Sequence, residues 1–62
     1  MSTMIAIEFE KGQAVEVFTE DEWCKGIVTD IDETSSRPCR VMYSINGVSD
    51  EAWFGLASIQ TR

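Results

Sequence analysis

The stretch Cys39-Arg40-Val41-Met42-Tyr43-Ser44-Ile45-Asn46-Gly47 decides the fold of this chain. Its first seven residues alternate in polarity, as expected of an extended strand with one buried face. The residues on that face are Cys39, Val41, Tyr43 and Ile45. Asn46-Gly47 then favours a two-residue type I′ turn, because both central residues of that turn need a positive φ. We therefore expect a hairpin whose second strand returns over about Ser49 to Phe54.

Further segments with the same period-two alternation lie on both sides of this hairpin. Ala14 to Phe18 forms one such strand, with Val15 and Val17 on one face and Glu16 and Phe18 on the other. The longest candidate runs from Trp23 to Ile31, and its interior Gly26 predicts a bend or bulge. In this strand we expect one face to carry Trp23, Ile27 and Ile31, and the opposite face to carry Cys24 and Val28.

Turn residues separate these strands. The polar cluster Thr19 to Glu22 and the segment Asp32 to Pro38 predict loops, and Gly55 to Ser58 is long enough for one 3₁₀ turn before a last short strand at Ile59 to Thr61. No window of 11 residues has helical periodicity. The prediction is an all-β single domain over residues 1–62, a strongly bent five- to six-stranded barrel with an extra N-terminal strand at 4–9 and a barrel core at 11–61.

Composition limits the kinds of function. The chain has 62 residues, 11 acidic and 5 basic, and a formal net charge of −6. A negative protein repels phosphate polymers and anionic membranes, so we expect neither nucleic acid nor a membrane as partner. A chain this short has no room for a deep interdomain cleft. The absence of histidine removes the usual general base and the Ser-His-Asp and Cys-His arrangements, so we do not expect an enzyme.

The cysteines and the N-terminal residues bear on compartment and cofactors. Cys24 and Cys39 are 15 residues apart, with no C-x-x-C pair and no histidine, so neither a metal site nor any cofactor is predicted. The main interpretation is that both cysteines are reduced thiols that pack as small hydrophobic residues, and the alternative is a disulfide between them. The start of the chain lacks the basic and apolar regions of a signal peptide, and we expect a cytoplasmic protein.

Four segments in order resemble the Tudor and Agenet members of the SH3-like barrels. The resemblance covers about residues 11–60 and rests on a glycine before a Val-x-Val strand, a second strand with an aromatic start, a third strand ending in an aromatic residue, and a closing hydrophobic turn. The segments are Lys11 to Phe18, Trp23 to Val28, Val41 to Tyr43, and Trp53 to Ile59. In that family two to four aromatic side chains at one end of the barrel hold a methylated lysine or arginine by cation–π attraction.

The resemblance implies a candidate site, residue by residue. Phe18 matches the aromatic residue that ends the first Tudor strand, Tyr43 matches the one that ends the third, and Trp23 lies at or next to a further cage position. Ser44 to Val48 offers no aromatic residue at the usual fourth position. The hypothesis is a non-enzymatic protein-binding surface for a basic, optionally methylated, peptide, formed by Phe18, Trp23, Tyr43 and Phe54 and rimmed by Glu20, Asp21, Glu22 and Asp50.

A weaker resemblance is to the type II, plasmid-borne dihydrofolate reductases, which are also small SH3-like barrels. The Val-Gln-Ile-Tyr stretch that lines their pore corresponds to Glu51-Ala52-Trp53-Phe54, and none of its residues is retained. We do not expect this activity.

Other interpretations stay open. Trp23 and Trp53 are expected to be core or rim residues, because a small domain needs bulky side chains to fill its centre. Tyr43 is expected to be half-buried with its hydroxyl at the surface. Two alternative functions remain: an acidic decoy that occupies a nucleic-acid-binding partner, and an oligomeric structural barrel assembled through the N-terminal strand.

Overall fold

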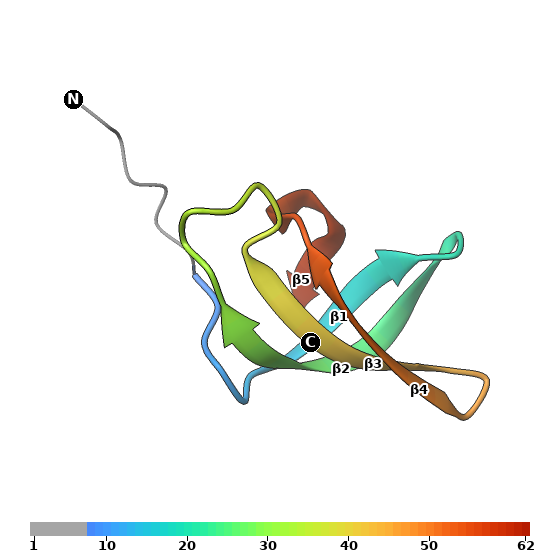
Figure 1. Cartoon of the computed structure of the whole chain (residues 1–62). Coiled ribbons are helices and arrows are strands. Elements are labelled where there is room, and N and C mark those ends of the chain that lie inside the picture. The colour runs from blue at the N-terminus through green and yellow to red at the C-terminus, as the bar shows by residue number, and fades with distance from the viewer. Residues whose placement is uncertain (1–7) are drawn as a thin grey trace.

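The computed structural model describes residues 8–62 as an all-β domain. The strands are β1 (Ala14–Thr19), β2 (Glu22–Ile31), β3 (Cys39–Ile45), β4 (Val48–Phe54) and β5 (Ile59–Thr61), with the 3₁₀ turn η1 (Leu56–Ser58) before the last. They form one antiparallel sheet in the order β4-β3-β2-β1-β5. Figure 1 shows how strongly this sheet curves. Its two outer strands, β4 and β5, are not hydrogen-bonded to each other, so the fold is barrel-like but open.

Two tight hairpins set the register of the sheet. Asn46 and Gly47 have φ values of 52° and 80°, which confirms the predicted type I′ geometry between β3 and β4. Between β1 and β2 the segment read as a four-residue loop is a turn with only two central residues, Glu20 and Asp21, at φ 51° and 64°. The pattern of polar residues predicted a loop but gave no sign of so tight a turn, since glutamate is uncommon at positive φ.

Small aliphatic side chains and both cysteines build the core. The buried hydrophobic residues of the core are Val15, Val17, Cys24, Val28, Cys39, Val41, Tyr43 and Ile59. Of the two places expected for Trp23 and Trp53, core or rim, the core is excluded, because the two residues are 41% and 38% exposed. The strongly curved sheet leaves a narrow interior that valine-sized side chains fill, and Tyr43, at 8% exposure, is more buried than predicted.

The long strand β2 departs from the prediction in the position of its bulge. The register between β2 and β3 shifts between Val28 and Asp30 and not at Gly26. This shift reverses the alternation, so Ile31 pairs with Cys39 and packs against the core, not on the face of Trp23 and Ile27 as expected. Gly26 serves a different purpose: a Cβ there would lie 2.7 Å from the Met42 carbonyl oxygen and from Val41 Cγ1.

The loop before β3 agrees with the prediction, whereas the described end of the N-terminal segment does not. Residues 32–38 form a loop that is exposed except at the buried Pro38, and Asp32 Oδ1 accepts hydrogen bonds from the Thr34 amide and hydroxyl at 3.0 and 2.7 Å. Most of the strand expected at residues 4–9 lies outside the described residues, and residues 8–10 are not in a strand, although Phe9 packs against the core. Within residues 8–62 no helix has the length and apolar character of a membrane span.

Candidate functional site

The four aromatic residues of the predicted cage form two separate pairs. Phe18 and Trp23 are opposite each other in the β1–β2 ladder and pack edge to face, with ring centroids 5.4 Å apart. Tyr43 and Phe54 pack in the same way, also at 5.4 Å. Because side chains alternate along each strand, Phe18 lies on the face opposite the buried Val17, whereas Tyr43 shares the core face of its strand. The sheet therefore separates the two pairs.

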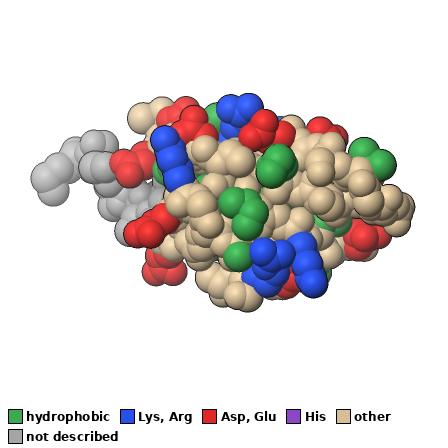
Figure 2. Space-filling model, turned by 90° about the horizontal axis from the view of Figure 1, so that it is seen from below, with side chains coloured by type: hydrophobic (Ala, Val, Ile, Leu, Met, Phe, Trp, Pro, Cys, Tyr) green, Lys and Arg blue, Asp and Glu red, His purple; other side chains and the backbone are tan. Residues whose placement is uncertain are grey.

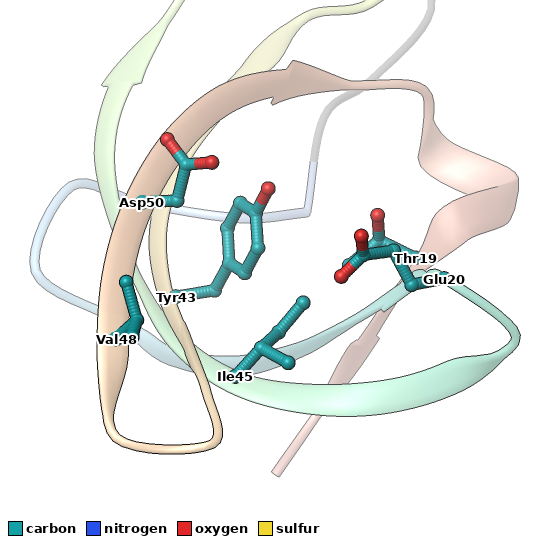
Figure 3. A pocket seen from close by; sticks show the side chains of 6 residues that line it. All are labelled: Thr19, Glu20, Tyr43, Ile45, Val48 and Asp50. Carbon is teal, nitrogen blue, oxygen red and sulfur yellow. The ribbon is translucent and has the colours of Figure 1, made fainter.

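A pocket of ≈ 270 Å³ opens on the concave side of the sheet. Its lining residues come from the β1–β2 and β3–β4 hairpins, whose turns lie at the same end of the sheet (Figure 1). The pocket is lined by Thr19, Glu20, Tyr43, Ile45, Val48 and Asp50. The Tyr43 ring stands in the middle, Asp50 and Val48 lie on one side of it, and Thr19 and Glu20 on the other (Figure 3). Three of the eight predicted site residues, Glu20, Tyr43 and Asp50, thus come together in one concave site.

Register explains how residues far apart in sequence reach this pocket. Tyr43 pairs with Asp50 across the β3–β4 ladder, and Ile45 pairs with Val48 at the end of the same hairpin. Residues paired across two strands project to the same face, so all four line the concave side. Glu20 lies in the turn of the β1–β2 hairpin, where its positive φ helps to reverse the chain directly after β1.

The pocket is electronegative. Burial raises the pKa of the Tyr43 phenol, and the nearby carboxylates of Asp50 and Glu20 raise this pKa further. Among the described residues the salt bridges are Lys11–Asp30 and Arg40–Glu51, so neither acid of the pocket is neutralised by an ion pair. The site consists of an aromatic ring, two apolar side chains, Thr19 and two carboxylates without an ion-pair partner among the described residues, which suits a cationic group.

The other predicted site residues lie apart from the pocket lining. Phe18 and Trp23 form an exposed aromatic pair on the convex side, and Phe54 is partly buried beside Tyr43. Asp21 and Glu22 are exposed at the β1–β2 turn. Acidic side chains are also spread over the surface, as Figure 2 shows for one face of the molecule, where exposed hydrophobic side chains lie between them.

Sequence analysis missed Thr19, Ile45 and Val48 as lining residues. The alternation had placed Ile45 on the face of Tyr43, and the Asn46-Gly47 turn fixes Val48 as its partner. Both residues could therefore have been predicted as lining residues from the hairpin register. Thr19 could not have been predicted, because its position depends on the unexpected two-residue turn that follows it.

The cysteines and the acidic groups do not form a metal centre in the part of the chain that the structure describes. Cys24 and Cys39 are both buried and both free, so in this structure they pack as small core side chains. Within residues 8–62 no group of three or more Cys, Asp or Glu side chains is arranged to hold a metal ion.

Comparison with known proteins found no matching family model, no matching curated protein and no matching solved structure.

Proposed function

We propose that this domain is a non-enzymatic protein-binding module that accepts a lysine or arginine side chain of a partner in the pocket around Tyr43. The observation that carries the proposal is the placement of an aromatic ring between two carboxylates that have no basic partner among the described residues. A cation above or beside a tyrosine ring gains roughly 0.5–2 kcal/mol, depending on how far it is desolvated. Negative charge around the ring adds to this attraction.

The size of the pocket supports a single side chain as the ligand. Sites for small molecules usually enclose roughly 300–1,000 Å³, and this pocket is smaller, at ≈ 270 Å³, and open to solvent. Ile45 and Val48 provide an apolar wall on which the methylene chain of a lysine can pack while its ammonium group reaches the carboxylates.

The resemblance to Tudor domains supports recognition of a basic residue, but the pocket favours a different methylation state. Phe18 and Trp23 lie on the other face, so within the pocket one aromatic ring lines the site. A trimethylated ammonium group has no N–H to donate to a carboxylate, whereas unmodified lysine and arginine have several. We therefore propose that the domain prefers unmethylated lysine or arginine to the fully methylated form.

Calorimetric titration with a lysine-containing peptide tests the proposal. The probe is an acetylated, amidated peptide of sequence threonine-valine-threonine-lysine-threonine-valine-threonine, with a norleucine analogue that keeps the length of the lysine side chain without its charge. The variant Glu20→Gln/Asp50→Asn removes the charges of the pocket, and Glu10→Gln/Glu33→Gln makes the same change in net charge at exposed sites outside the pocket lining. We expect lysine-dependent binding that the first variant loses and the second keeps. Equal affinity for the norleucine analogue would overturn the proposal.

A further inference from the structure

The sheet has one long free edge next to the pocket. In the described part of the chain β4 is the outermost strand, paired with β3 alone, and Val48 to Glu51 are exposed along it. The edge at β5 is only three residues long, against seven for β4. Figure 1 shows the tip of the β3–β4 hairpin extending away from the rest of the sheet. Unpaired strand edges are templates for an added strand.

The backbone groups that face this edge follow from the turn. In a two-residue hairpin the residues flanking the turn, here Ile45 and Val48, form a hydrogen-bonded pair, and such pairs then alternate with non-bonded pairs. Ser49, Glu51 and Trp53 fall in the non-bonded pairs, so their N–H and C=O groups point outward. One hydrogen bond agrees with this assignment: the Glu51 N–H donates to Asp50 Oδ1 at 2.8 Å.

We infer that the basic partner binds as an extended strand added antiparallel to β4, with its lysine or arginine opposite Asp50. This inference rests on the proposed function of the Tyr43 pocket. A residue opposite Asp50 shares the concave face with Asp50 and with Tyr43, its partner one strand further in. Its side chain can therefore reach the pocket directly from the new strand.

The neighbouring positions predict a sequence pattern. Residues two before and two after the basic residue lie on the same face, opposite Val48 and Ala52, so apolar side chains fit there. The pattern is apolar-x-basic-x-apolar. A basic side chain that draws the Asp50 carboxylate into an ion pair also releases the Glu51 N–H for the added strand, so charge recognition and strand pairing support each other.

Charge argues against a second copy of this chain as the occupant. Pairing two β4 strands antiparallel over their full length puts Glu51 opposite its own copy, and like charges directly opposite are destabilising. Each chain also carries a net charge of −6. A basic strand has the complementary charge.

Backbone methylation of the same peptide tests the inference. In an antiparallel addition the two threonines beside the lysine turn their N–H groups toward β4, whereas the N–H of the lysine points away. N-methylation of both threonines should weaken binding about tenfold or more, since two hydrogen bonds are lost, and N-methylation of the lysine should change it less than about twofold. A control peptide with each valine moved next to the lysine places the apolar groups on the wrong face and should bind more weakly.

The outcomes separate this inference from the proposed function. Equal binding of both methylated peptides, or a larger loss from methylation at the lysine, would overturn antiparallel strand addition even if binding still required the lysine charge. Loss of the difference between lysine and norleucine would overturn the proposed function as well. Hydrogen exchange gives a second readout: the amides of Ser49, Glu51 and Trp53 should exchange more slowly in the complex.

Discussion

Tyr43 on β3 lies directly opposite Asp50 on β4, so a buried aromatic ring and a carboxylate share the concave face of the sheet (Figure 3). Tyr43 is 8% exposed and the carboxylate is at the surface, which places a charge at the mouth of the pocket beside an aromatic ring. Glu20 adds a second charge from the other hairpin. This arrangement is the basis of the proposal that the domain binds a basic side chain.

The strained turn at Glu20 predicts a conflict between stability and binding. Glu20 has φ 51°, a left-handed conformation that costs most L-residues about 1 kcal/mol or more and that glycine and asparagine adopt more readily. Glu20→Asn should therefore raise the free energy of unfolding by about 1 kcal/mol and, because it removes a pocket charge, weaken binding of the lysine peptide. Urea denaturation and calorimetric titration measure the two effects.

Asp21→Gly is the matched control for that variant. Asp21 also has a positive φ, 64°, but it does not line the pocket. The substitution should stabilise the fold to a similar extent and leave peptide affinity unchanged. Parallel changes in affinity for both variants would mean that Glu20 acts through the turn and not through its charge.

Gly26 should tolerate no side chain. A Cβ at this position would lie 2.7 Å from the Met42 carbonyl oxygen, which the β2–β3 pairing holds in place. Overpacking of this kind costs roughly 1–3 kcal/mol, and we expect Gly26→Ala to lower the free energy of unfolding by about 2 kcal/mol. At Gly55 the nearest contact of an added Cβ is 3.5 Å, so Gly55→Ala should be nearly neutral. Similar destabilisation by both variants in urea titrations would refute this close-approach explanation.

Stability should fall in acid because several carboxylates, Asp30 and Asp32 among them, are stabilised in their charged form. Hydrogen bonds from the Thr34 side chain and backbone lower the pKa of Asp32, and hydrogen bonds from the Ile31 amide and from Lys11 lower the pKa of Asp30. A folded-state pKa below the unfolded value of 3.8 gives stability that is present above that value and is lost as pH falls through the folded-state pKa. Melting temperatures between pH 6 and pH 2 measure this loss, and Thr34→Ala should reduce its size. An unchanged profile would show that the Asp32 turn does not contribute.

Both thiols should react slowly in the folded protein. Burial raises the pKa of Cys39, and burial together with the charges of Glu22 and Glu20 raises that of Cys24. The thiolate is the reactive species, so iodoacetamide at pH 7 should label neither cysteine until the chain is unfolded in denaturant. Rapid labelling of Cys24 under native conditions would contradict its burial.

The main features of the fold could be predicted from local sequence, and the errors have specific physical causes. Alternation and the Asn46-Gly47 turn predicted β3, β4 and their register, because side-chain direction has a strict period of two in a strand. The prediction put the bulge at Gly26, but it lies after Val28. A glycine inside a strand indicates either a bulge or a close backbone approach, and Gly26 is a position of close approach. Ile31 was put on the wrong face as a result.

The candidate site was predicted in part. Tyr43, Glu20 and Asp50 were chosen from the sequence and meet in the pocket, whereas Phe18 and Trp23 lie on the opposite face. The alternation of β1 shows that Phe18 faces away from Val15 and Val17. Whether Phe18 lies near Tyr43 depends on how the sheet curves, and a linear sequence pattern does not contain that information. Thr19 lines the site because a tight turn follows it, and the residue types of that turn, Glu20 and Asp21, did not predict so tight a turn.

Amide chemical-shift mapping of the labelled protein with the lysine peptide tests the central claim most directly, because it locates the binding surface as well as measuring affinity. The account predicts that the largest shifts fall on Glu20, Tyr43, Ile45, Val48 and Asp50, and that they disappear with the norleucine analogue. Shifts concentrated on Phe18 and Trp23, or no localised shifts, would contradict it.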